Sequence, residues 1–372
     1  MMLYYKYKHA RLSGRHIHSC VVFVLISKIW RSLNMYDIDL NRYAEVVNSA
    51  IGLRPQIEKA VDEICAQGYS NLFFIGCGGT YAHSLPMMYW LETTTNKVEA
   101  HSVIAAEFMA MGHKAFSKDS VCIFSTRSGN TKEIVAAAKF CKEAGARTMV
   151  YVSNDNTPVC EYADYKFYSP AEDPDLCEAI YSYMICLLGR FMKNAGAFDK
   201  YDEFMNQFAD LTKYLIAAKE KMDPACQELA KKFKNVDYHM VIGSGMLWGE
   251  AYDYAMCILE EMQWIRTKSI HACEYFHGTL ELVEKDTSLI LFYGEDETRP
   301  LMDRVLKFSK TVTNEITIFD TKEIELPFTD PEFRKIVSPI VIYAMTERLS
   351  AHLAKERNHP LTTRRYYRQM EY

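Results

Sequence analysis

Carboxylates and imidazoles gather in one stretch of this 372-residue chain, residues 260–284, which reads EEMQWIRTKSIHACEYFHGTLELVE. It holds two adjacent acids, Glu260 and Glu261, and two histidines, His271 and His277. A carboxylate and an imidazole placed together can move protons at neutral pH, because the ordinary pKa of imidazole lies close to it. The stretch therefore indicates acid–base catalysis, unless these side chains only cover the surface of a helix and a strand.

Hydroxyl groups gather in a second stretch, STRSGNTKE, where an apolar run ends and a helical pattern begins. Ser125, Thr126, Ser128 and Thr131 supply four hydroxyls over seven residues. Backbone N–H groups at the start of a helix attract anions, and an N-cap alone needs only one hydroxyl. We therefore expect this turn to bind phosphate, at the carboxyl end of a strand, where open parallel sheets hold their ligands.

A glycine-rich turn, GCGGTYAHS, follows an earlier apolar run. It lacks the third glycine of the GxGxxG dinucleotide motif, so we expect no nucleotide cofactor there. Gly78 and Gly79 are expected to form a tight turn between a strand and a helix. The pattern recurs as DYHMVIGSGMLWGEA, with Ser244 between two glycines, and this predicts an internal repeat. Gly78, Gly79 and Ser244 are possible substrate contacts.

Apolar runs alternate with helical patterns along most of the chain, which is typical of parallel sheets with helices on both faces. We expect an α/β fold with two domains, residues 35–215 and 216–372, each a flavodoxin-like three-layer sandwich. The pattern predicts helices at 39–67, 81–92, 131–145 and 172–233, strands at 71–79, 120–130, 147–155 and 315–320, and strand and helix signals at 287–310.

Residues 1–34 differ from the rest of the chain, with six Lys or Arg and no acid. The apolar run at 21–26 is too short to span a bilayer, and no small-residue cleavage site follows it. We interpret this segment as lying outside the fold, with Met35 as the true start. An amphipathic extension is the alternative.

The bulk composition excludes several classes of protein. A formal net charge of −5 gives no basic field for nucleic acid. The 11 cysteines are scattered without a CxxC pair, which indicates reduced thiols in the cytoplasm. No zinc ligand set stands out, so we expect neither a metal nor a membrane anchor.

The glycine turn and the hydroxyl turn together resemble the sugar isomerase (SIS) domain. From about residue 36 onward the chain looks like a tandem SIS protein, similar to the isomerase half of glucosamine-6-phosphate synthase. The resemblance implies that Thr80, Thr126, Ser128 and Thr131 hold a sugar phosphate, with Arg127 where the synthase has an amide. Nothing before Met35 resembles a glutamine-hydrolysing domain, so ammonia-dependent synthesis is not expected.

A closer resemblance is to deglycases of fructoselysine 6-phosphate and 6-phosphofructose-aspartate, through EEMQWIRTKSIHACEYFHGT and the tail HPLTTRRYYRQMEY. In that family a Glu and a His act together, 16 residues apart as in the synthase. Since 277 − 261 = 16, the spacing selects Glu261 and His277, with Glu274 as the competing carboxylate. Thr279 and Cys273 replace the usual Pro and Gly, which could alter the loop.

The resemblance implies a reaction. His277 would assist ring opening of a 1-amino-1-deoxy-ketose 6-phosphate, and Glu261 would move a proton from C1 to C2. Hydrolysis of the resulting Schiff base would give glucose 6-phosphate and an amino acid, without metal or organic cofactor. In relatives the site lies at a dimer interface, so His277 could act on the partner's substrate. Arg364 and Arg365 of the tail could bind the substrate's carboxylate, or lie in solvent.

Two alternatives remain open. An aldose–ketose isomerase or an aminosugar-phosphate deaminase would use the same phosphate turn and the same acid–base pair. A sugar-phosphate sensor without turnover would not need Glu261. Sensors of that kind usually carry a DNA-binding helical domain, and the short basic segment at residues 1–34 does not resemble a helix-turn-helix.

Overall fold

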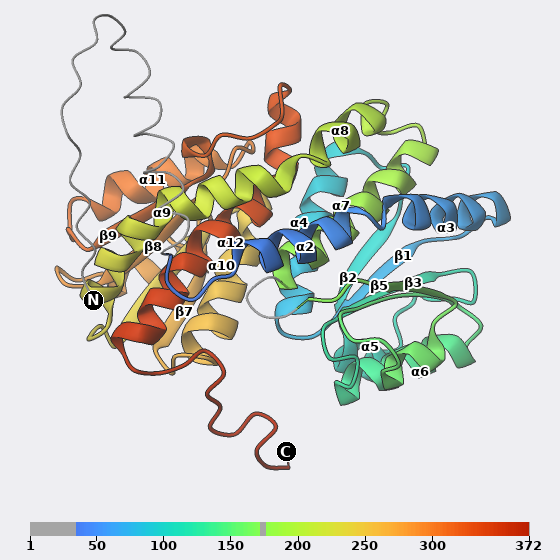
Figure 1. The fold of residues 1–372 in the computed structure, drawn as a ribbon, viewed down its shortest axis with the longest axis horizontal. Helices are drawn as coiled ribbons and strands as arrows, with labels where there is room; N and C mark the ends of the chain where they lie inside the picture. The colour runs from blue at the N-terminus through green and yellow to red at the C-terminus, as the bar shows by residue number, and fades with distance from the viewer. Residues whose placement is uncertain (1–34, 172–175, 372) are drawn as a thin grey trace, which may run out of the picture. The chain divides into compact units, whose positions relative to one another are not determined.

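The computed structural model describes residues 35–171 and 176–371, and the chain divides after Ile38 into two units (Figure 1). The fold belongs to the second unit, Asp39–Tyr372. The interpretation of residues 1–34 lies outside the described residues. No helix in the described part of the chain is both long and apolar enough to cross a membrane.

The first half is built on a five-stranded parallel sheet with the order β2-β1-β3-β4-β5. In this order the chain leaves β1 toward one edge and then returns to β3 on the other side, so ligands are expected at the carboxyl ends of these two strands. The strands are β1 (Leu72–Gly76), β2 (Ala100–Ile104), β3 (Val121–Thr126), β4 (Arg147–Val152) and β5 (Tyr165–Tyr168).

Helices cover both faces of this sheet (Figure 1). On one face, Phe73 and Phe124 pack with Phe108 of α5 and Ile134 of α6. On the other face, Tyr151 stacks on Tyr183 of α7 with ring centroids 5.1 Å apart. The helices of this half are α2 (Leu40–Ile51), α3 (Arg54–Gln67), α4 (Gly79–Thr94), α5 (Ala105–Met111), α6 (Lys132–Glu143), α7 (Leu176–Asn194) and α8 (Tyr201–Phe208).

The second half repeats the design with a four-stranded parallel sheet, in the order β7-β6-β8-β9. This is the first sheet's order without its fifth strand, which confirms the predicted repeat and the α/β fold class. The strands are β6 (Tyr238–Gly243), β7 (Arg266–His271), β8 (Ser288–Tyr293) and β9 (Ile316–Asp320), and the helices are α9 (Leu211–Phe233), α10 (Trp248–Asp253), α11 (Arg299–Ser309) and α12 (Pro331–Glu356).

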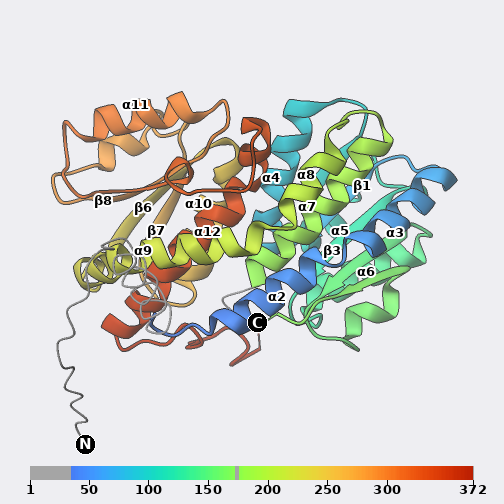
Figure 2. The ribbon, with the colours of Figure 1, turned by 45° about the horizontal axis from the view of Figure 1, so that its top comes forward.

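The expected boundary between residues 215 and 216 falls inside α9, which packs along α12 of the second half (Figure 2). We therefore propose a boundary between α8 and α9. The halves also meet where α4 packs on α10. A Cβ atom at Gly249 would lie 2.4 Å from the carbonyl oxygen of Ala82, so only glycine allows this close approach.

Candidate active site

Glu261 follows a π-helix, Tyr254–Glu260, that continues α10. The backbone N–H of Glu261 donates to the carbonyl of Met256, five residues back, at 3.0 Å. The helical turn before Glu261 is therefore wider than a turn of an α-helix. Such turns are rare and often mark functional sites. Glu260 is exposed and accepts from Thr267 Oγ1 at 2.6 Å, whereas Glu261 is half-buried.

The C-terminal tail holds the segment that contains Glu261. Arg364 Nε lies 2.9 Å from Glu261 Oε1. Gln263, which is fully buried, donates through Nε2 to the carbonyl of His359 at 2.8 Å. The guanidinium of Arg365 lies 4.1 Å from the ring centroid of Trp264, a non-glycine residue with φ +55°. The tail therefore contacts three of the four residues of the segment Glu261–Trp264. One of these contacts places Arg364 against the candidate base, Glu261.

The hydroxyl turn lies between β3 and α6, as the sequence predicts. Thr126 Oγ1 accepts from the backbone N–H of Gly129 at 3.2 Å, and this bond closes the turn. Thr131 occupies the N-cap position of α6, but its side chain makes no capping hydrogen bond. Capping of the helix therefore does not explain the hydroxyl of Thr131, which leaves this hydroxyl available to a ligand.

The tail also reaches this turn. Arg368 donates from Nη2 to Ser128 Oγ at 3.0 Å. One short segment of chain thus contacts the candidate base through Arg364 and the candidate phosphate turn through Arg368. Two stretches more than a hundred residues apart in sequence meet the same tail, and sequence spacing gives no signal for this. The exposed side chain of Arg127 extends from the same turn.

The glycine turn follows β1, next to the hydroxyl turn across the point where the strand order reverses. Gly78 has φ +56°, a left-handed conformation that favours glycine. Thr80 Oγ1 donates to the carbonyl of Cys77 at 3.0 Å and accepts from its N–H at 3.1 Å. Thr80 therefore stabilises the turn itself, and its role toward phosphate stays a prediction.

His277 lies in the loop that follows β7. Its side chain is exposed, and so is that of Glu274, whose carbonyl accepts from the His277 backbone N–H at 3.0 Å. His271 is instead half-buried: its Nδ1 accepts from the Cys273 N–H at 3.2 Å, and burial lowers its pKa. The imidazole of His277 is therefore the more accessible of the two, and its action in trans stays a prediction.

The corresponding point of the second sheet is filled by a carboxylate. Asp296, which is 6% exposed, accepts from the backbone N–H groups of Met246 at 3.1 Å and Thr298 at 2.8 Å. Ser244, expected as a possible substrate contact, shares a hydrogen bond with Thr298 Oγ1 at 2.7 Å. The carboxylate of Asp296 already accepts hydrogen bonds from these two N–H groups, and its negative charge would repel a phosphate. The phosphate site is therefore expected in the first half only.

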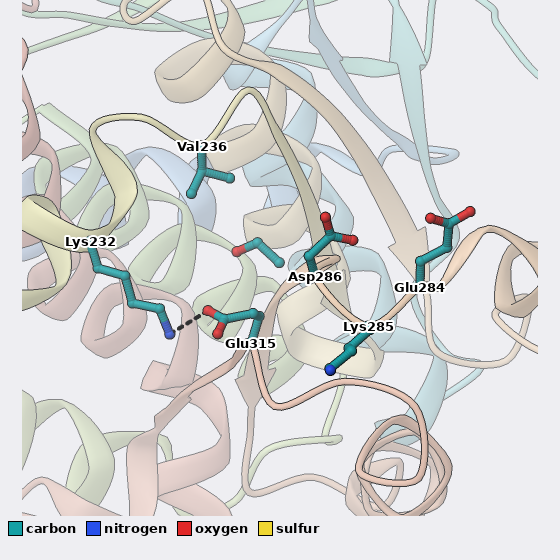
Figure 3. Close-up of a pocket in the computed structure, with 7 residues that line it drawn as sticks. Lys232, Val236, Glu284, Lys285, Asp286 and Glu315 are labelled. Carbon is teal, nitrogen blue, oxygen red and sulfur yellow. Dashed lines mark ion pairs between the residues drawn. The ribbon is translucent and has the colours of Figure 1, made fainter.

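A cavity of about 620 Å³ lies elsewhere, before the starts of β6, β8 and β9 (Figure 3). Lys232 and Glu315 form an ion pair of 2.5 Å at its edge. It lies at the amino ends of the strands, opposite to the end where open parallel sheets bind their ligands. Its lining is Lys232, Val236, Glu284, Lys285, Asp286, Ser288 and Glu315.

The chain is similar in sequence to known sugar-phosphate proteins. Residues 68–188 match the SIS domain model. Fructosamine deglycase FrlB of Bacillus subtilis is 30% identical over 322 residues, which cover 85% of this chain and 97% of that protein. The chain belongs to the SIS-domain family. The residues expected at the phosphate turn all lie within the matched domain.

Other relatives agree with this assignment. Fructoselysine 6-phosphate deglycase of Escherichia coli K12 is 22% identical over 320 residues, covering 84% of this SIS-domain enzyme and 90% of that protein. A crystal structure of a proposed phosphosugar isomerase from Bacillus subtilis superposes with a TM-score of 0.79 at 28% identity. That match covers 87% of this chain and 99% of the other.

The hydroxyl turn allows a direct test of its backbone. Gly129 and Gly112 have nearly equal φ angles, +61° and +62°. A Cβ at Gly129 would lie 2.0 Å from Thr157 Oγ1, whereas nothing lies within 4 Å at Gly112. We expect Gly112→Ala to lower the free energy of unfolding by about 1 kcal/mol and Gly129→Ala by about 3 kcal/mol. Urea unfolding of both variants measures the difference, and equal losses would contradict the crowding argument.

Proposed function

We propose that this SIS-domain enzyme is a deglycase that cleaves the 6-phosphate of an Amadori product to glucose 6-phosphate and a free amino acid. The observation that carries the proposal is the tail that contacts both Glu261 and Ser128. It links a carboxylate able to move protons with a turn suited to phosphate. The deglycase names of FrlB and of the Escherichia coli relative support the same reaction.

In this proposal the phosphate occupies the hydroxyl turn. The hydroxyls of Thr126, Ser128 and Thr131 and the N-terminus of α6 surround it, and Thr80 keeps the neighbouring glycine turn in shape. The helix dipole and free N–H groups favour the dianion there. The second half is expected not to compete for the phosphate, because Asp296 fills its equivalent turn.

The chemistry is a proton transfer followed by hydrolysis. Glu261 takes the proton from C1 of the open-chain ketoamine, and the C1–H electrons form the C1–C2 double bond of an enaminol. The C2 carbonyl oxygen gains a proton as this double bond forms. The proton held by Glu261 is then returned at C2, while the nitrogen lone pair forms the C1=N bond and the nitrogen gives up its proton, so that C2 carries a hydroxyl group. The resulting imine at C1 adds water, and its C–N bond breaks to release the amine. His277 serves ring opening as a proton shuttle.

Arg364 has a defined part in this scheme. Its guanidinium, 2.9 Å from Glu261, would orient the carboxylate, since charge-assisted hydrogen bonds have a defined geometry. The tail arginines also provide charge for a substrate carboxylate, since guanidinium groups bind carboxylates in a bidentate manner. We propose a cytoplasmic homodimer in which His277 serves the partner's site.

The substrate assay is direct. Glucose 6-phosphate release is measured with 6-phosphofructose-aspartate and with fructoselysine 6-phosphate, beside fructose 6-phosphate and glucosamine 6-phosphate. Turnover of either conjugate supports the deglycase, and the higher kcat/KM identifies the amino acid. Turnover of fructose 6-phosphate or glucosamine 6-phosphate alone would replace the proposal by the isomerase or the deaminase. Binding without any turnover would favour a sensor.

The contact of Arg368 with Ser128 gives a further prediction. Replacing Arg368 by Met removes the charge that faces the phosphate turn, and we expect KM to rise about tenfold, as for loss of about 1.4 kcal/mol of binding. Gln369→Ala is the matched control, because Gln369 is the next residue in the tail and its side chain is exposed. Steady-state kinetics on the preferred conjugate provides the measurement. An unchanged KM for Arg368→Met would remove the tail from phosphate binding.

A further inference from the structure

Three ligand-type side chains meet beneath the glycine turn, away from solvent. His83 of α4, Cys177 of α7 and Asp253 of α10 are 3%, 8% and 3% exposed. One ligand atom from each lies within 4.8 Å of the other two, and His83 Nε2 is 3.7 Å from Asp253 Oδ2. Among the described residues this is the one group of three or more such side chains close enough to share a metal ion.

The imidazole of His83 is a sign that the group has a ligand. Both ring nitrogens are buried, and neither has a hydrogen-bond partner among the described residues. A buried polar atom without a partner costs free energy, and native proteins rarely leave one so. The Nε2 atom points to the carboxylate of Asp253 at a separation longer than a hydrogen bond but suited to two ligands of one ion.

A second buried carboxyl group lies on the helix that carries Asp253. Glu250 lies on the same helix as Asp253, is fully buried and accepts from the hydroxyl of Tyr181. A cation held by Asp253 would lie about one helical turn from this second buried carboxyl group.

We propose that His83, Cys177 and Asp253 bind a divalent zinc-class metal ion. A thiolate, an imidazole and a carboxylate are the donor types that zinc prefers. With Cys177 and Asp253 ionised and His83 neutral, the three ligands cancel the charge of the ion, which suits a buried site. The thiol proton of Cys177 is released to solvent on binding, and a water molecule completes the tetrahedron.

The site would act on the glycine turn. A Cβ at Gly79 would lie 2.7 Å from Asp253 Oδ1, so the carboxylate supports the backbone of that turn directly. Holding Asp253 on a metal would also join α4, α7 and α10, which come from both halves of the fold. The ion is therefore structural, and the proposal stands whether or not the chain is a deglycase.

Cobalt substitution tests the site without an activity assay. The full chain is stripped with a chelator, dialysed and titrated with Co²⁺, whose bond to a thiolate gives a charge-transfer band in the near ultraviolet. We expect one equivalent per chain, displaced by Zn²⁺, and a rise in the melting temperature with either ion. Cys177→Ser should lose the band, and Asp253→Asn should weaken binding at least tenfold.

Two cysteines serve as controls. Cys186 is buried on the same helix as Cys177, and Cys273 is exposed and open to adventitious binding. Serine at either position should leave the band unchanged. A wild-type chain that shows no band, or a band that survives in Cys177→Ser, would overturn the proposal. Because the wild-type titration decides this, the test does not depend on the variants folding.

Discussion

Glu261→Gln is expected to lower kcat for glucose 6-phosphate release by about 10³-fold, because an amide cannot accept the C1 proton. A positioned general base contributes on the order of 10² to 10⁴, and 10³ corresponds to about 4 kcal/mol of activation free energy. The amide oxygen of glutamine can still accept a hydrogen bond from Arg364, which pairs with Glu261. KM and the melting temperature should therefore change little.

Glu260→Gln is the matched control for this result. Glu260 is the adjacent acid, is exposed, and accepts from Thr267 through an oxygen that glutamine retains. We expect its kcat within about twofold of wild type, as for a surface substitution. Equal losses at both positions, or full activity of Glu261→Gln, would mean that the base is another residue, with Glu274 the next to replace.

His277→Ala is expected to lower kcat about 10²-fold, because ring opening loses its proton shuttle. The effect should be smaller than that of Glu261→Gln, since some open-chain ketose is present without catalysis. His271→Asn is the control. Its amide oxygen can replace Nδ1 as the acceptor for the Cys273 N–H, and we expect near wild-type turnover.

Mixing tests where His277 acts. If the imidazole serves the partner's substrate, heterodimers of Glu261→Gln and His277→Ala subunits contain one site with both groups intact. Subunit exchange between the two inactive proteins should then restore a measurable fraction of activity. Verified heterodimers without recovery would place His277 and Glu261 in the same subunit's site.

The sequence predicts most of the central strands because their burial is continuous. Strands such as β1 and β3 are fully buried, and such apolar runs are distinct in sequence. The strands β2 and β7 were not predicted, since their AHSVI and RTKSIH segments are only partly buried and carry polar residues. The π-helix before Glu261 was also missed, because it depends on packing around the turn rather than on local propensity.

The candidate site is predictable only where its residues form a local motif. The hydroxyl turn is continuous in sequence and was placed correctly between a strand and a helix. The contacts of the tail join segments that are distant in sequence. The group of His83, Cys177 and Asp253 likewise comes from three separate helices. Their spacing matches no metal motif, so the expectation that no metal binds was drawn from spacing alone.

The central claim is that one enzyme separates a sugar phosphate from an amino acid. Proton NMR of the wild-type reaction with 6-phosphofructose-aspartate, and separately with fructoselysine 6-phosphate, follows both products at once. We predict that one conjugate yields glucose 6-phosphate and the free amino acid in equal amounts, and that Glu261→Gln forms neither. Sugar isomerisation with the amino acid still attached, or no change in either conjugate with folded protein, would contradict the account.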